Sequence, residues 1–269
     1  MADFIELHAR SAFSFLRGAD HPEAIVREAA RHKMQAMALT DRDGVYGSAR
    51  AHFAAKELKK EHGKDFRALI GAEVTLAGEA VVPILVKSRT GYQNLCQLLT
   101  RGKLRGLSET EAQENPLLNP RKDGRVTLAE VEEFADGLIS LTGDEDGAIL
   151  KALQRGDTDS AEKSLLQQIH VFGKENVVVE IHRHHLRGEE WINRHLIDLG
   201  DTHGLMVICS NRVESANRQG RFIADAFTSL RNRVNLDTAG KLLARNAETY
   251  LKSPAQMTAL FADRPEVVE

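Results

Sequence analysis

The sequence predicts an α/β fold in which helices cover a mainly parallel sheet. Short apolar runs alternate with amphipathic helical segments along the chain. These runs are apolar at nearly every position, as expected for strands that are buried on both faces. With 269 residues, the chain also has the length of many single α/β barrels.

Seven apolar runs are the expected strands, and amphipathic segments separate most of them. The expected strands are 4–8, 34–40, 68–76, 81–87, 137–142, 177–182 and 205–210. The expected helices are a first one from about residue 22, then 48–61, 91–101, a short one after 127, 146–155, 158–172, 189–203 and helical pieces in the tail. The polar stretch 102–125 contains Gly, Pro and Asn and little periodicity, which indicates a loop.

Three helix starts carry capping signals. Asp20 is the expected N-cap of the first helix, with Pro22 in its first turn. Thr127 and Glu130 have the spacing of a capping box. Ser253 is followed directly by a proline, which is typical of an N-cap and first helical position.

Bulk properties limit the function classes. The net charge of −3 gives no electrostatic reason for tight nucleic-acid binding by this chain alone, so we expect only indirect contact with DNA. Cys96 and Cys209 are the two cysteines, and both lie in apolar segments, which suits reduced thiols. No apolar run has the length of a membrane span, and the start is unlike a signal peptide. We therefore expect a cytoplasmic protein with no membrane partner.

Polar residues gather where the expected strands end, which is where parallel α/β folds place their chemistry. These residues are His8, Arg10, Asp41, Arg42, Glu73, Glu180, His182, Arg183, His184, His185, Asn211, Arg212 and Glu214. Imidazoles and carboxylates on one face are what a divalent-metal site requires. The arginines among them cannot coordinate a cation.

Several segments, in order along nearly the whole chain, resemble the PHP (polymerase and histidinol phosphatase) domain of bacterial C-family DNA polymerases. They include LHARSAFSFLRGADHPEAIVREA, ALTDRDGVYGSAR, LIGAEVTL, VVVEIHRHH and NAETYLKSPAQMTALFAD. The likeness is to the error-prone branch of the DNA polymerase III alpha type, which works in replication and translesion repair. It implies a distorted, seven-stranded TIM-like barrel with outer helices. It also implies one domain over 1–269, in which 213–269 is a candidate extension toward the polymerase body.

Intact members of this family hold up to three divalent metals and hydrolyse phosphoesters, so the resemblance also assigns ligand positions. His8 matches the first histidine of the family's His-x-His motif, and Arg10 stands at the second. Asp41 matches the aspartate of the Thr-Asp-His motif, and Arg42 replaces its histidine. Glu73 matches the glutamate after Ile-Gly.

The later motifs of the family are less well kept. His184 is the preferred match for the histidine after the strand at 177–182, with His182 and His185 as rivals. Arg212 and Glu214 stand where the family has Asp-x-His, so neither ligand type is kept in place. The residual ligand set implied by the resemblance is therefore His8, Asp41, Glu73 and His184.

Arginines in a metal site change its electrostatics. Two unit charges 4 Å apart interact by about 4 kcal/mol at an effective dielectric constant of 20, and the repulsion roughly doubles for a dication. The sequence therefore suggests that an ion-pair network replaces the metals, with Arg10, Arg42 and Arg212 paired to Asp41, Glu73 and Glu214. The alternatives are that the arginines are solvated and that Asp41 caps a turn.

Two functional hypotheses from different classes follow. The first is a non-catalytic scaffold with a degenerate metal site and no cofactor, whose partners are a polymerase body, in the same or a separate chain, and other replication or repair proteins. The second is a metal-dependent phosphoesterase or 3′–5′ exonuclease that uses Zn²⁺ or Mn²⁺ on the reduced ligand set. A third option is an adaptor that binds proteins through the loop at 102–125.

Overall fold

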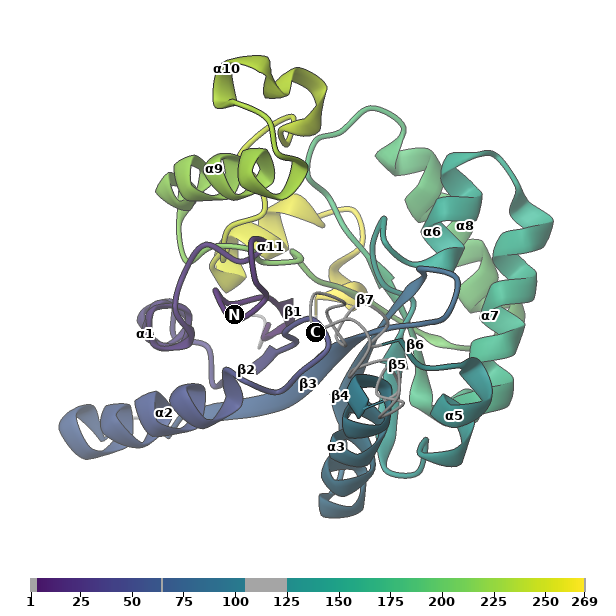
Figure 1. The fold of residues 1–269 in the computed structure, drawn as a ribbon, viewed down its shortest axis with the longest axis horizontal. Coiled ribbons are helices and arrows are strands. Elements are labelled where there is room, and N and C mark those ends of the chain that lie inside the picture. Colours follow the sequence, from purple (N-terminus) through teal and green to yellow (C-terminus); the bar gives the residue numbers. More distant parts are fainter. Residues whose placement is uncertain (1–3, 64, 105–124, 269) are drawn as a thin grey trace, which may run out of the picture.

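The computed structural model describes residues 4–63, 65–104 and 125–268, which are built around one seven-stranded sheet (Figure 1). The strands are β1 (Glu6–Ala9), β2 (Ala36–Leu39), β3 (Arg67–Thr75), β4 (Val81–Val86), β5 (Leu138–Leu141), β6 (Val177–Ile181) and β7 (Met206–Cys209). They lie side by side in the same order as in the sequence. Each falls on an apolar run that the sequence predicts as a strand, which confirms the α/β class.

The sheet is parallel except around β4. The pairs β1–β2, β2–β3, β5–β6 and β6–β7 are parallel, whereas β4 runs antiparallel to both of its neighbours. Only five residues, 76–80, connect β3 to β4. A parallel pair needs a crossover of a dozen or more residues. The short connection therefore makes β3 and β4 an antiparallel hairpin.

The two edges of the sheet approach each other, as in a distorted barrel. Just beyond β7, Val213 forms a parallel bridge with Ala9 at the end of β1. The Arg10 amide donates to the Val213 carbonyl, and the Val213 amide donates to the His8 carbonyl, both at 2.8 Å. This closure brings residues that follow β1 and β7 into one place.

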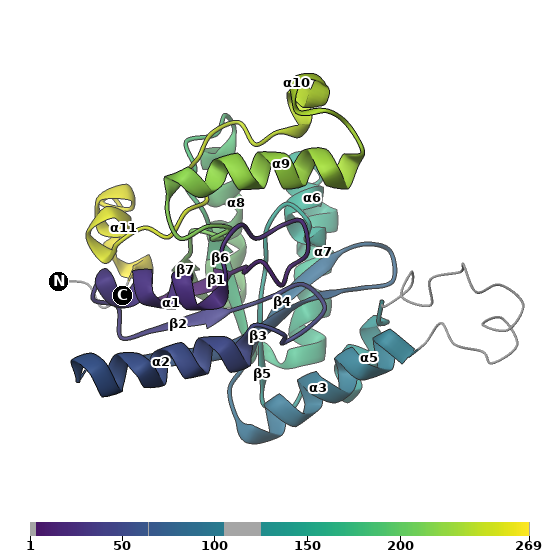
Figure 2. The same ribbon diagram turned by 60° about the vertical axis from the view of Figure 1, so that its left-hand side comes forward.

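Helices cover the outside of the sheet (Figures 1 and 2). They are α1 (Pro22–Arg31), α2 (Ser48–His62), α3 (Arg89–Leu104), α5 (Leu128–Glu133), α6 (Ala148–Gln154), α7 (Thr158–Phe172), α8 (Glu189–His203), α9 (Arg221–Asn232), α10 (Leu236–Ala239) and α11 (Pro254–Leu260). In Figure 2, α9 and α10 lie at the opposite end of the molecule from α2 and α3. Within the described residues, no helix is long and apolar enough to cross a membrane.

The capping boxes of α5 and α11 are present as predicted, at Thr127 and Ser253. The predicted cap of α1 is wrong: His21 is the N-cap residue, without a side-chain cap bond. Asp20 instead accepts a hydrogen bond from the amide of Ala216, at 2.7 Å. Its carboxylate therefore ties the start of α1 to a segment almost 200 residues later, a contact that local sequence cannot reveal. Residues 105–124 of the predicted loop lie outside the described residues, and 102–104 belong to α3.

One large hydrophobic core runs through the described chain, and a smaller cluster of strand residues is built around Ala38, Leu85 and Leu141. Apolar side chains of the strands and covering helices form the large core, and the segment after residue 213 adds Leu251, Met257, Phe261 and Val267. The chain beyond β7 therefore packs on the same core as the sheet.

Candidate functional site

Arg10 lies at the centre of a buried charge cluster where the strands end. Its side chain is 2% exposed and follows β1. Its Nε donates to Glu73 Oε1 at 2.5 Å, its Nη1 donates to Glu214 at 3.0 Å, and its Nη2 donates to Asp144. A buried guanidinium is stable only when carboxylates compensate its charge, and this one has three. Burial alone would lower the pKa of Arg10, but these carboxylates raise it.

Glu73 in β3 is the carboxylate on which this cluster converges. Its Oε1 accepts from Arg10 and lies 2.7 Å from His8 Nε2, and its Oε2 accepts from Arg42 Nε at 2.6 Å. Burial alone would raise the pKa of Glu73, but Arg10 and Arg42 lower it to about 2. The expected pairing of these two arginines with Glu73 is therefore confirmed.

His8 lies between two buried carboxylates. Its Nε2 faces Glu73, and its Nδ1 lies 3.0 and 3.1 Å from the two oxygens of Glu180 in β6. Burial alone would lower the pKa of His8, but Glu180 and Glu73 raise it to about 10. An imidazole with an anion at each nitrogen donates from both, so His8 is a cation at neutral pH.

The other two arginines extend the cluster toward the surface. Arg42 also donates to Asp146, at 2.6 Å. Arg212 contacts Asp144 and Glu145, and its Nη2 lies 3.7 Å from Glu214. Arg212 has a left-handed backbone, with φ of 45°, which is strained for a residue with a Cβ. In this conformation the Arg212 guanidinium reaches the acidic turn after β5.

Asp41 differs from the expectation, because its described contacts are to serines rather than to an arginine. Its Oδ1 accepts from the amide of Ser11 at 2.8 Å and from the hydroxyl of Ser14 at 2.8 Å, and the Ser11 hydroxyl lies 2.9 Å from each oxygen. The neighbouring Arg42 points its guanidinium at Glu73 and Asp146 instead. Burial raises the pKa of Asp41. The aspartate thus organises the turn after β1.

His182, rather than His184, faces the cluster from the end of β6. Its Nε2 lies 3.4 Å from Glu180 Oε1, and its ring centroid is 6.4 Å from that of His8. His184 stacks on His182 but approaches the Asn211 carbonyl and Glu189. The third rival, His185, is exposed.

The acidic turn at 143–147 supplies partners that were not identified from the sequence. The sequence predicts a helix over 146–155, and α6 begins at Ala148, directly after this turn. However, Asp144 is 2% exposed and pairs with Arg10, and Asp146 pairs with Arg17 and Arg42. Arg10 and Arg212 lower the pKa of Asp144, against the effect of burial. Its position directly after a strand was the signal that could have placed it in the cluster.

Two groups of three described donors are close enough to share a metal ion: His8, Glu180 and His182, and His8, Glu73 and Asp144. His8 belongs to both groups, so a metal ion could bind there only by displacing the proton that His8 shares with Glu73 and Glu180. Glu73 and Asp144 already accept from Arg10. Only His182 Nε2 among these donors is buried without a hydrogen bond in the described residues. This donor set does not fit a cluster of several metals.

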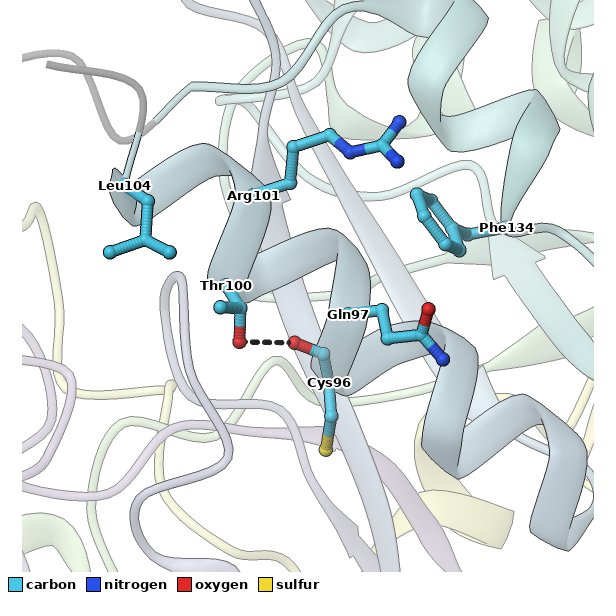
Figure 3. A pocket seen from close by; sticks show the side chains of 6 residues that line it. All are labelled: Cys96, Gln97, Thr100, Arg101, Leu104 and Phe134. Carbon is cyan, nitrogen blue, oxygen red and sulfur yellow. Dashed lines mark hydrogen bonds between the residues drawn. The ribbon is translucent and has the colours of Figure 1, made fainter.

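A separate hollow of about 630 Å³ lies between α3 and α5, away from the strand ends (Figure 3). Cys96, Gln97, Thr100, Arg101, Leu104 and Phe134 line it. The Arg101 guanidinium lies 4.5 Å from the centre of the Phe134 ring and pairs with Glu133. These six residues include no histidine or carboxylate, so they do not form a second metal centre.

Comparison with known proteins agrees with the family resemblance seen in the sequence. Residues 6–184 match the family model described as PHP domain. The chain is 36% identical over 276 residues to an error-prone DNA polymerase of Mycolicibacterium paratuberculosis, and 32% identical over 271 residues to one of Symbiobacterium thermophilum. These matches cover 98% and 99% of this chain but 24% of each relative.

Solved structures are more distant. A protein described as a metal-dependent phosphoesterase of Bifidobacterium adolescentis is 16% identical, with a TM-score of 0.47, and the match covers 77% of this chain and 86% of that one. The family model covers well over half of this chain, and the polymerase relatives match almost all of it. The chain therefore belongs to the PHP domain family, as a homologue of a region of error-prone DNA polymerases.

Proposed function

We propose that this chain is a non-catalytic PHP scaffold in which buried ion pairs take the structural place of the family's metals. The observation that carries the proposal is the position of Arg10, which contacts Glu73, Asp144 and Glu214 from inside the cluster. A guanidinium at this point donates to the oxygens that a metal would need. It also repels any dication that approaches them.

Charge balance within the cluster supports this proposal. The positive groups are His8, Arg10, Arg17, Arg42 and Arg212, and the facing carboxylates are Glu73, Asp144, Glu145, Asp146, Glu180 and Glu214. The two sets differ by one charge. The ion-paired groups are therefore close to neutrality without a metal, and the buried carboxyl groups of Asp41 and Glu6 lie beside them with raised pKa values. Two or three added dications would leave a large positive charge among the paired groups.

The function of such a scaffold is to support a polymerase. The chain spans about a quarter of the length of the polymerases it matches, so we propose that its main partner is the rest of such a polymerase, in the same or a separate chain. DNA contact is then indirect, other replication or repair proteins are further candidate partners, and the location is cytoplasmic. Within this proposal, residues 213–268 form the side of the domain that leads toward the polymerase.

A second candidate function has one observation in its favour. His182 Nε2 is buried without a hydrogen bond and lies beside Glu180 and His8. If His8 lost its proton, these three residues could hold one Zn²⁺ or Mn²⁺ ion, which would supply Lewis-acid activation of a phosphodiester. The residual set proposed from the sequence, His8, Asp41, Glu73 and His184, is less suited to this, because Asp41 and His184 face other partners.

Hydrolysis assays separate the two functions. The purified chain is incubated with a chromogenic phosphodiester and with 3′-labelled single-stranded DNA, each in the presence of Zn²⁺ or Mn²⁺. The scaffold proposal expects the same background rate for the wild type and the Glu73→Gln variant. A wild-type activity that Glu73→Gln or His182→Ala abolishes would establish the phosphoesterase instead.

A further inference from the structure

Helix α9 turns three polar side chains toward the protein and leaves large apolar side chains exposed. Its polar residues Arg221, Asp225 and Ser229, spaced four apart, face the protein. Arg221 pairs with Asp225 and donates to the carbonyls of Ala244 and Asn246, and Ser229 is buried. A helix in a globular protein normally turns its apolar stripe inward. Here the inward face is mixed, because the half-buried Ala224 and Phe227 lie beside these polar residues.

The outward face of α9 and the turns after it are apolar. The exposed large hydrophobic side chains there are Phe222 (77% exposed), Ile223 (44%), Leu230 (63%), Leu236 (52%) and Leu242 (50%). Ile223 and Leu230 share a face because they lie seven residues apart in a helix, and Phe222 precedes Ile223. Single exposed hydrophobic residues need no explanation, but a cluster on one element indicates an interaction surface. We call these five residues the α9–α10 face.

We infer that the α9–α10 face is the docking surface for a part of an error-prone DNA polymerase outside the region that this chain matches; this inference rests on the proposed scaffold function. The face lies beyond the family model, which ends at residue 184, yet inside the alignment to the polymerases, which covers 98% of the chain. It therefore belongs to what this chain shares with polymerases beyond the PHP domain itself. About three quarters of each polymerase remains to supply the partner.

The charges around the face indicate the chemistry of the partner. Residues 218–245 contain six Arg or Lys and two Asp or Glu, although the whole chain has a net charge of −3. Arg218 pairs with Glu248 and Arg221 with Asp225, so the basic rim consists of Arg231, Arg233, Lys241 and Arg245. A second copy of this chain would bring two basic rims together and be repelled. The complementary surface is an apolar groove with an acidic rim.

Hydrogen bonds also connect the segment around α9 to the turn that follows Arg10, next to the strand-end cluster. Arg231 at the end of α9 donates to the carbonyl of Leu16 at 3.0 Å, in the turn that follows Arg10. Asp20 in the same turn holds the amide of Ala216, just before α9. Docking at α9 would therefore be held in a fixed orientation relative to the strand-end cluster.

A chimeric polymerase tests the inference. This chain replaces the matching region of the M. paratuberculosis polymerase, and hydrogen exchange of residues 221–243 is compared between the chimera and the isolated chain. We expect exchange of this segment to slow at least tenfold in the chimera. We expect Leu230→Asp and Phe222→Asp to abolish that slowing, whereas Phe53→Asp, an exposed aromatic on α2 at the other end of the molecule, keeps it.

The outcomes distinguish this inference from the proposed function. If the chimera synthesises DNA but exchange at 221–243 is unchanged, the docking surface is wrong and the scaffold function stands. If the chimera synthesises no DNA while the parent polymerase does, both fail. Self-association of the isolated chain that Leu230→Asp removes would assign the face to a second copy and overturn the proposed partner.

Discussion

The strand-end cluster and the α9–α10 face satisfy their side chains in opposite ways. In the cluster, Arg10 and Glu73 are buried and every charge that they carry is met by a partner within the chain. On α9, by contrast, Phe222, Ile223 and Leu230 are left exposed to water. Carboxylates that already accept hydrogen bonds from internal cations are not available as metal ligands. Exposed apolar surface, in contrast, is stabilised when a partner covers it. The difference supports the proposal that this domain functions in binding.

The largest effect is expected from Arg10→Ala. This change leaves Glu73, Asp144 and Glu214 without their shared cation in a buried site, and such a loss costs about 3–5 kcal/mol of unfolding free energy. Urea unfolding followed by circular dichroism measures it. Arg27→Ala is the matched control, because Arg27 pairs with Glu57 on the surface and should cost at most about 1 kcal/mol. Equal losses of unfolding free energy for the two variants would show that the buried pairs of Arg10 stabilise the domain no more than a surface pair.

The next effect is the pH dependence that His8 confers. Its pKa is raised from 6.5 to about 10 by Glu180 and Glu73, so the stability it contributes is complete below pH 6.5 and is lost as pH rises toward 10. We expect the free energy of unfolding to fall by a few kcal/mol between pH 7 and pH 10. The His8→Gln variant should be less stable at pH 7 and show a flatter profile over that range. A wild-type profile that is flat from pH 7 to pH 10 would contradict a protonated His8.

A smaller effect is expected at the turn that Asp41 organises. The Ser14 hydroxyl donates to Asp41 and accepts from the amide of Arg42, so Ser14→Ala removes two buried hydrogen bonds. We expect a loss of about 1–3 kcal/mol. Thermal unfolding checks it, with Thr202→Ala at an exposed position of α8 as a control. No difference between these variants would mean that Asp41 is held by Ser11 alone.

The smallest effect is expected on the α9–α10 face. Leu230 is mostly exposed, so Leu230→Asp should change the unfolding free energy of the isolated chain by no more than about 0.5 kcal/mol. By comparison, Leu95→Ala in the core should cost about 2–5 kcal/mol. Urea unfolding of both variants tests the contrast. A large loss for Leu230→Asp would show that the face is part of the domain's own packing.

Local patterns predicted the elements of the fold well, because strands and helices each impose a period on the apolar residues. Helix α8 and helix α7, for example, have the predicted bounds. The cap of α1 was missed because Asp20 serves a distant amide. The direction of β4 was not predicted, although the five-residue connection before it contained that information.

The sequence predicted most of the residues that gather in the cluster, but not all of the contacts between them. The positions of Arg10, Arg42 and Glu73 at strand ends were enough to place them together. Asp144 was overlooked because an acidic turn also begins a helix, so its sequence did not separate the two roles. The preference between His182 and His184 depends on where β6 ends, since Glu180 and His182 share one face of the strand only up to that point. Which side chains of α9 face the protein depends on its tertiary contacts, so the sequence alone did not reveal it.

Metal content is the measurement that tests the central claim most directly. The purified chain is saturated with Zn²⁺ or Mn²⁺, desalted and analysed by inductively coupled plasma mass spectrometry. Because Arg10 already occupies Glu73 and Asp144, we expect no stoichiometric metal in the wild type. One or more ions per chain, lost on substitution of His8 or Glu73, would contradict the replacement of the metals by arginines.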